Sequence, residues 1–148
     1  MTRAKILGAG LLCSLLAAGA VASGGSAQEP PRTIDLVTQH AGGFRVDNPP
    51  RGASAGDLFG FRETLISNGT RVGRGHGTCV AVTRTLSECS VSAILADGTI
   101  AVRLAQDFSK RENTAAVVGG TGAYRGARGQ AAIRSGRRGN RIAIELVE

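Results

Sequence analysis

Cysteine and histidine, which can serve as nucleophiles, bases or metal ligands, account for five residues of this 148-residue chain, three cysteines and two histidines. Beyond Cys13, the cysteines are Cys79 and Cys89, placed symmetrically about Arg84 as opposed residues of one hairpin would be. An even pair in an exported chain favours a disulfide, which would stabilise the fold by about 3 kcal/mol, with Cys79 as a reactive thiol the alternative. The histidines, His40 and His76, show no ligand spacing with these cysteines, so we expect no metal site.

Glycine is unusually dense between Gly119 and Gly129, around the single tyrosine, Tyr124. The run begins as Gly120-x-Gly122 after β-branched residues, as a nucleotide-binding loop does. The dinucleotide fingerprint, however, needs its third glycine one residue before Gly126, and no Gly-Lys-Ser/Thr follows for a P-loop. The stretch therefore predicts a strand, a glycine-built corner and a second strand, and we expect no nucleotide cofactor.

Arginines gather near the C-terminus, with no acidic residue between Asn113 and Ile144. A basic patch of this kind can bind nucleic acid or another anionic surface. Nucleic-acid binders usually interleave aromatic residues for stacking, and only Tyr124 is present. We expect no specific nucleic-acid binding, and we interpret Arg137-Arg138 as a solvated hairpin tip. The cluster consists of Arg125, Arg128, Arg134, Arg137, Arg138 and Arg141.

The first 27 residues are typical of a secretory signal peptide. Arg3 and Lys5 precede an uncharged run, and Ala20-Val21-Ala22 or Gly25-Ser26-Ala27 would serve as the cleavage site. The run is short for a retained membrane anchor, and Leu12 before Cys13 does not suit lipidation. Cleavage would lower the formal net charge from +7 to +5, because it removes Arg3 and Lys5 and no acid. We expect a secreted protein without a transmembrane segment after cleavage.

About 120 residues then remain, enough for one domain. We expect residues 28–56 to form an N-terminal extension with a first strand at 33–37 and a long loop at 40–56, and residues 57–148 to form the rest of the domain. Asn68-Gly69 and Asp97-Gly98 predict hairpin turns. Short strands and no helical period predict an all-β sandwich or barrel. The later strands are expected at 57–66, 72–83, 89–95, 99–106, 114–118, 131–134 and 142–147.

Three blocks resemble the allene oxide cyclase barrel-like and dirigent-like superfamily. The glycine stretch resembles its signature, in which Gly-Gly-Thr-Gly and an aromatic residue precede Arg-Gly, here Gly119, Gly120, Thr121, Gly122, Tyr124, Arg128 and Gly129. Gly56-Asp57-Leu58-Phe59-x-Phe61 resembles an early strand of the family, and Arg71-Val72-Gly73 with Gly77-Thr78-Cys79-Val80 resembles the next. The resemblance implies a small, mostly antiparallel eight-stranded barrel whose central apolar cavity is lined by Phe59, Phe61 and Tyr124.

The resemblance carries over little of the cyclase chemistry. Plant cyclases have a Glu-x-Asn pair on the first strand, where this chain has Asp35-Leu36-Val37, and Glu63 replaces an asparagine after the early strand block. The cyclases also carry a cysteine at the position of Cys79. Dirigent-like proteins need only a shaped cavity and a few polar residues. Candidate polar residues are Asp35, Asp57, Glu63, Arg74 and Arg128, with a surface ion pair as the alternative for each.

We therefore expect a secreted barrel that binds a small apolar or amphipathic molecule without a metal or cofactor, and that steers its coupling or cyclisation. One alternative is a cofactor-independent isomerase or cyclase. The second is an envelope-associated protein that binds anionic surfaces through its arginine cluster.

Overall fold

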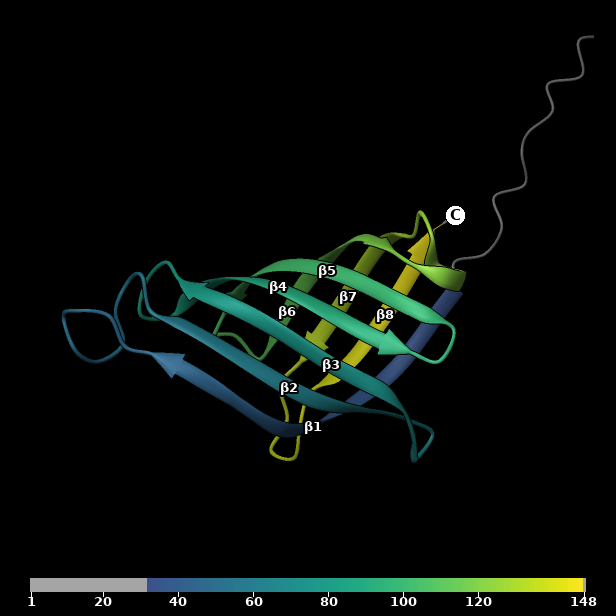
Figure 1. Cartoon of the computed structure of the whole chain (residues 1–148), viewed down its shortest axis with the longest axis horizontal. Helices are drawn as coiled ribbons and strands as arrows, with labels where there is room; N and C mark the ends of the chain where they lie inside the picture. Colours follow the sequence, from purple (N-terminus) through teal and green to yellow (C-terminus); the bar gives the residue numbers. More distant parts are fainter. Residues whose placement is uncertain (1–31, 148) are drawn as a thin grey trace, which may run out of the picture.

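The computed structural model describes residues 32–147, which form a closed β-barrel of eight strands (Figure 1). Each strand pairs antiparallel with the next, and β8 pairs with β1 to close the barrel, which confirms the predicted fold class. The predicted signal peptide lies outside the described residues. The strands are β1 (Arg32–Val46), β2 (Leu58–Ser67), β3 (Thr70–Ala81), β4 (Leu86–Leu95), β5 (Gly98–Asp107), β6 (Glu112–Gly120), β7 (Arg128–Arg134) and β8 (Arg141–Val147).

Helical structure within residues 32–147 is limited to one 3₁₀ turn, η1 (Gly122–Tyr124). No helix in this part of the chain is long and apolar enough to cross a membrane. The turn belongs to the glycine corner between β6 and β7, where Gly122 has φ 61° and Gly129 has φ 138°. Residues with a Cβ rarely adopt a positive φ of this size, so the corner needs glycine at both positions. The predicted strand, glycine corner and second strand are confirmed.

The hairpin turns follow local sequence closely. Asn68 and Gly69 have φ 50° and 77°, and they connect β2 to β3 as predicted. The turn predicted at Asp97-Gly98 lies one residue earlier, at residues 96–97, because Gly98 is already the first residue of β5. A side chain on Gly98 would collide with the Thr121 carbonyl, so this glycine serves the packing of the glycine corner against β5.

The first strand is much longer than predicted, and the expected loop at 40–56 is wrong for residues 40–46. β1 continues to Val46 and pairs with β2 from Val37 onward. A β-bulge between His40 and Gly42 absorbs one extra residue, and Gly42 has φ 128°. Two adjacent glycines therefore bend the strand here instead of ending it. The connection between β1 and β2 is residues 47–57.

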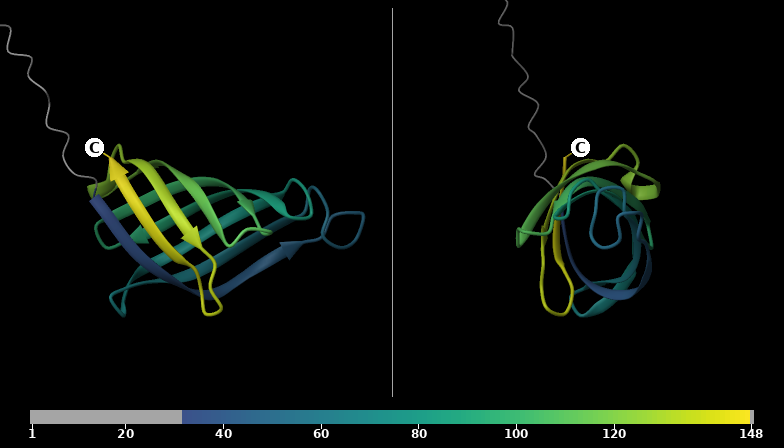
Figure 2. Two further views of the ribbon diagram at one scale, coloured as in Figure 1. Left: turned by 180° about the vertical axis from the view of Figure 1, so that it is seen from behind. Right: turned by 90° about the vertical axis from the view of Figure 1, so that its left-hand side faces the viewer.

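Alternating side chains of the strands fill the barrel, and Figure 2 (right) shows the closed ring of strands from the side of the β1–β2 loop. Glycine on β3 makes room inside, since a Cβ on Gly77 would lie 2.7 Å from Cζ of Phe61. The core of buried apolar residues consists of Leu36, Leu65, Cys79, Cys89, Ile100, Val102, Leu104, Ala115, Val117, Tyr124, Ala131, Ile144 and Leu146.

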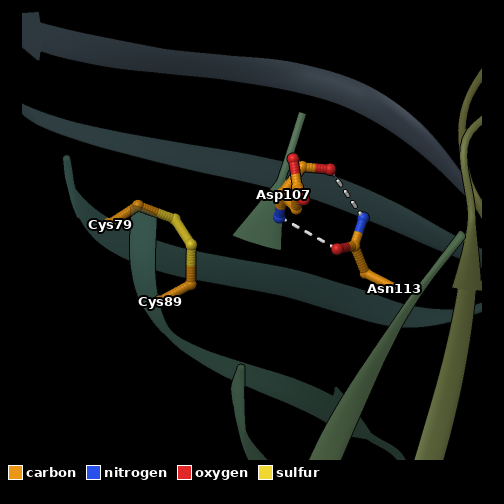
Figure 3. The surroundings of a disulfide bond; sticks show 4 residues. All are labelled: Cys79, Cys89, Asp107 and Asn113. Atoms are coloured by element: carbon orange, nitrogen blue, oxygen red, sulfur yellow. Dashed lines mark hydrogen bonds between the residues drawn. A yellow bond between two sulfur atoms is a disulfide. The ribbon is translucent and has the colours of Figure 1, made fainter. Parts of the chain in front are cut away.

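The two ends of the barrel differ. The glycine corner and Tyr124, which is 4% exposed, lie at the end that holds the β2–β3 and β4–β5 turns. At the other end, β1 to β4 extend beyond β6 to β8 (Figure 1). β5 and β6 pair through their backbones only from Ile100 to Arg103, near the glycine corner. At the second end, the side chain of Asn113 instead bridges the backbone N–H and C=O of Asp107 (Figure 3). We call this second end the loop end.

Candidate functional site in the barrel interior

A cavity of about 230 Å³ lies inside the barrel, toward the loop end. Residues of the loops at that end, Phe108, Ser135 and Asn140, contribute to its wall, whereas Tyr124 does not. Phe59 and Phe108 lie together in a tilted arrangement with ring centroids 6.0 Å apart. Most of the wall is apolar: Leu36, Phe61, Leu65, Val91, Ala93, Val102, Leu104, Ala131, Ile133, Ile142 and Ile144 take part in it.

Among the residues that the structure describes, Glu63 is the one charged residue that lines this cavity. It extends the inward face of β2, two residues from Phe61 and two from Leu65. The hydroxyl of the fully buried Thr38 donates a hydrogen bond to Glu63 Oε1 at 3.0 Å. Thr38 in turn accepts a 3.1 Å bond from the Asn140 backbone N–H on its hydroxyl, and its own N–H donates to the Asn140 carbonyl at 2.9 Å. This chain of bonds fixes the carboxyl against the cavity wall.

Burial raises the pKa of the Glu63 carboxyl above its ordinary value. The hydrogen bond from Thr38 and the positive charge of His40 act in the opposite direction and keep the rise smaller. A carboxyl in this situation can accept a hydrogen bond or exchange a proton at a less acidic pH than a free one. Glu63 is therefore the group of the cavity best suited to contact the polar part of a bound molecule.

Four further polar residues lie in the wall without any charge: Ser92, Gln106, Ser135 and Asn140. Within residues 32–147, no three His, Cys, Asp or Glu side chains gather where a metal ion would need them. The arrangement is thus an apolar chamber with one carboxyl and a few neutral hydrogen-bonding groups, as in pockets that take small organic molecules.

Comparison with known proteins places this chain in a family. Residues 37–146 match the family model described as the allene oxide cyclase barrel like domain. The chain belongs to this family. The match covers most of the described barrel, and it confirms the resemblance seen in the sequence. No curated protein matches the chain.

Solved structures of the same barrel include proteins with different activities. A pyocyanin demethylase superposes with a TM-score of 0.73 at 22% identity, covering 78% of this chain and 100% of its own. A pterocarpan synthase dirigent protein gives 0.62 at 20% identity, covering 81% of this chain and 87% of its own. An exo-specific intermolecular Diels-Alderase gives 0.59 at 18% identity, covering 80% of this chain and 98% of its own. At these identities the likeness shows the allene oxide cyclase barrel fold alone.

Some of the residues predicted for the site line the cavity of this allene oxide cyclase-like barrel, and others lie on its outer surface. Glu63, Phe59 and Phe61 line the cavity. Asp35 and Arg74 are exposed on β1 and β3 and do not take part in its wall. Arg128 is exposed beside the glycine corner, where it donates to the carbonyl of Ala127 at 3.0 Å. The structure thus brings one of the five polar candidates into the cavity.

Asp57, the remaining candidate, is buried in the loop between β1 and β2. Its carboxylate accepts bonds from Arg45 Nη2 at 2.9 Å, from the Asn48 N–H at 3.0 Å, and from the Ser54 N–H at 3.2 Å. The bond from Arg45 is the main cause that holds the pKa of Asp57 below its ordinary value. Its backbone also bonds to Ala81 at the end of β3. Asp57 therefore ties the loop to the barrel instead of contacting the cavity.

Tyr124 occupies the opposite end from the cavity. The guanidinium carbon of Arg32 lies 5.2 Å from the centroid of its ring. Burial, followed by the bond to Asp97, raises the pKa of the Tyr124 hydroxyl. This aromatic residue of the family signature is part of the core beneath the glycine corner and not of the cavity wall.

Cys79 and Cys89 form a disulfide between β3 and β4 (Figure 3). The two residues are directly opposed in the register of the strands, as their symmetric placement about Arg84 predicts. Both are buried and line the cavity. In this state Cys79 is not a free thiol, and the pair forms part of the apolar wall.

Thr38, His40 and Asn140 were not predicted to lie around the cavity carboxyl. Thr38 continues the inward alternation of Ile34 and Leu36, and that period was the signal that could have revealed it. Asn140 follows a glycine-rich turn and meets Thr38 only because β8 closes against β1. No local pattern marks such a contact.

Proposed function

We propose that this barrel binds a small, largely apolar molecule that carries a hydroxyl or N–H group, and that it holds the molecule in a conformation that favours cyclisation or coupling. The observation that carries the proposal is the single carboxyl, Glu63, held by Thr38 in the wall of an apolar cavity. The apolar walls would desolvate the ligand, and the carboxyl would accept a hydrogen bond from its polar group.

The size of the cavity supports a ligand of one or two rings. Its volume of about 230 Å³ is below the range of about 300–1,000 Å³ that is usual for drug-sized ligands. Two of the structural neighbours are named as a pterocarpan synthase dirigent protein and a Diels-Alderase, so this barrel fold hosts proteins with such names. The neighbours agree with a role in ring formation or coupling and do not identify the substrate.

A cofactor-independent isomerase is the second candidate. Its supporting observation is also Glu63, because a carboxyl with a raised pKa can take a proton from one carbon or oxygen of a ligand and return it to another. We further propose that the protein acts outside the cytoplasm. The signal peptide predicted for residues 1–27 and the Cys79–Cys89 disulfide both support export.

Binding of two matched probes tests the proposed ligand class. Naphthalene and 2-naphthol differ by one hydroxyl, and both have two rings. We expect 2-naphthol to bind about tenfold more tightly at neutral pH, because its hydroxyl donates to the carboxyl. In Glu63→Leu this preference is expected to disappear while naphthalene still binds. Glu63→Gln retains a carbonyl acceptor and should keep part of the preference.

Glu88→Leu is the matched control, since Glu88 is exposed on β4 and does not line the cavity. It should keep the full preference for 2-naphthol. The proposal is wrong if neither probe binds the wild-type protein, or if the preference for 2-naphthol survives in Glu63→Leu.

A further inference from the structure

We propose that the outer face of β2 and β3 carries a binding site for a phosphate-like oxyanion, formed by Arg62, Arg71, Arg74 and His76. These four side chains line one shallow hollow on the outside of the barrel, together with Ala41, Thr64 and Ile94. The hollow opens on the outside of the barrel, and only Glu63 and Gly75 border both it and the interior cavity.

Strand register brings the basic residues together. Arg62 on β2 is directly opposite His76 on β3. Arg74 lies two residues before His76 on β3, and its side chain is on the same face of the sheet. Arg71 lies on the same strand, opposite Ile66. All four basic residues are exposed. Arg62 and Arg74 therefore place two positive charges at diagonal positions across β2 and β3, where long side chains can reach each other, and a bound anion would relieve their repulsion.

The protein itself supplies little counter-charge at this hollow. Among residues 32–147, the ion pairs are made by Arg32, Arg45, Lys110 and Arg134, none of which belongs to it. Glu63 is the one acid that borders the hollow, and its Oε1 is occupied by the bond from Thr38. The guanidinium groups of the hollow are thus free to bind an external anion.

The bulge of β1 makes room for one of these groups. Gly42 lacks a side chain at the point where the Arg62 guanidinium lies, and a Cβ there would be 2.9 Å from Nη2 of Arg62. The bulge therefore lets this long side chain lie along β1 at the rim of the hollow. A guanidinium presents a planar fork of donors that matches the oxygens of phosphate, which is why we assign an oxyanion of this class.

The arginines that cluster in the sequence do not form a comparable site. Arg125 and Arg128 lie at the glycine corner, whereas Arg134 to Arg141 surround the β7–β8 turn at the loop end. The length of β7 separates the two groups by roughly 20 Å. In addition, Arg134 pairs with Glu112 at 2.7 Å. The β7–β8 turn nevertheless supplies two exposed arginines, Arg137 and Arg138, as a control of equal charge.

Calorimetric titration with inorganic pyrophosphate at low salt tests the site. We expect binding to the wild-type protein and at least a tenfold loss in Arg62→Ala/Arg74→Ala. Arg137→Ala/Arg138→Ala removes the same two charges and should bind within about twofold of the wild type. Both variants should melt at a temperature no lower than that of the wild type and should keep the binding of 2-naphthol, so that failure here is distinct from failure of the cavity proposal.

Flotation with phosphatidylcholine vesicles, with and without phosphatidylglycerol, identifies the source of the phosphate. Pyrophosphate binding alone indicates a soluble phosphate compound, and phosphatidylglycerol-dependent flotation that is lost only in Arg62→Ala/Arg74→Ala indicates a lipid headgroup. The proposal is overturned if neither probe binds, or if the two double variants lose binding equally, since binding would then follow net charge alone.

Discussion

At the scale of single residues, Glu63 is the position where the interior of this barrel departs most from a plain apolar core. Its place was readable from the sequence, because Phe59, Phe61, Glu63 and Leu65 share one face of a period-two strand. The contacts that orient its carboxyl were not readable, since Thr38 and Asn140 approach from strands far away in the chain. The face of a side chain follows from local pattern, whereas its partners follow from closure of the barrel.

The raised pKa of Glu63 predicts a stability penalty that grows with pH. Because the folded state holds this proton more tightly than the unfolded state, stability is greatest below the ordinary pKa of 4.5 and falls as pH rises through the higher folded pKa. Glu63→Gln cannot ionise, so its melting temperature relative to the wild type should increase from pH 4 to pH 7. Thermal melts of both proteins measure this difference, with Glu88→Gln, a change at an exposed position of β4, as the matched control. A difference that stays flat across this range would contradict the burial of the carboxyl.

The lowered pKa of Asp57 predicts a pH dependence of stability opposite to that of Glu63. Its pKa is held down by Arg45, so the stability it contributes is present above the ordinary value of 3.8 and is lost as pH falls toward the folded pKa. In Asp57→Asn the bonds from Arg45, Asn48 and Ser54 lose their charged acceptor, and the β1–β2 loop should open. Trypsin should then cut after the exposed Arg51 several times faster than in the wild type. Asp47→Asn, which removes a carboxylate that bonds only to Gly52 in the same loop, is expected to have a smaller effect.

At the scale of secondary-structure elements, the turns were predictable and the first strand was not. Asn68-Gly69 specifies its turn through local backbone preference alone. The segment from His40 to Val46 contains Gly42-Gly43, which resembles a loop, and becomes a strand only because β2 pairs alongside it. A β-bulge inside a strand and a loop that ends a strand can have the same local composition, so pairing with a partner strand decides between them.

The β3–β4 hairpin gives a prediction about the disulfide. Cys79 and Cys89 are separated by 10 residues, and a bridge across so short a loop should stabilise the fold by about 3 kcal/mol in the chain-entropy estimate. Urea denaturation of the wild type with a phosphine reductant should show this loss relative to the oxidised protein. Cys79→Ala/Cys89→Ala is the control, and its transition should not respond to the reductant. Equal midpoints for oxidised and reduced wild type would show that the strand pairing alone holds the hairpin.

At the scale of the whole molecule, closure of the sheet creates both the cavity and the outer basic hollow. The eight-stranded barrel was predictable from strand count, turns and the three sequence blocks, and the family match confirms it. The grouping of Arg62, Arg71, Arg74 and His76 was not, because their proximity depends on the β2–β3 register and the bulge in β1. Sequence clustering pointed instead to arginines that the length of β7 holds apart.

Filling the cavity separates binding from folding at this scale. Ala93 lines the cavity, and its partner in register on β3 is Gly75, which has no side chain to compete for the space. Ala93→Leu should therefore leave the fold as stable as the wild type or up to about 2 kcal/mol more stable, because added methylenes occupy an apolar void. The same change should weaken naphthalene binding by at least about tenfold, since the leucine would occupy the volume that the ligand needs.

Ala105→Leu is the control, because it adds the same side chain at an exposed position of β5, and it should leave binding unchanged. Calorimetry and urea denaturation on the three proteins measure both effects. Undiminished binding to a stable Ala93→Leu barrel would place the ligand elsewhere on the molecule, and Glu63 would then not be the residue that orients it.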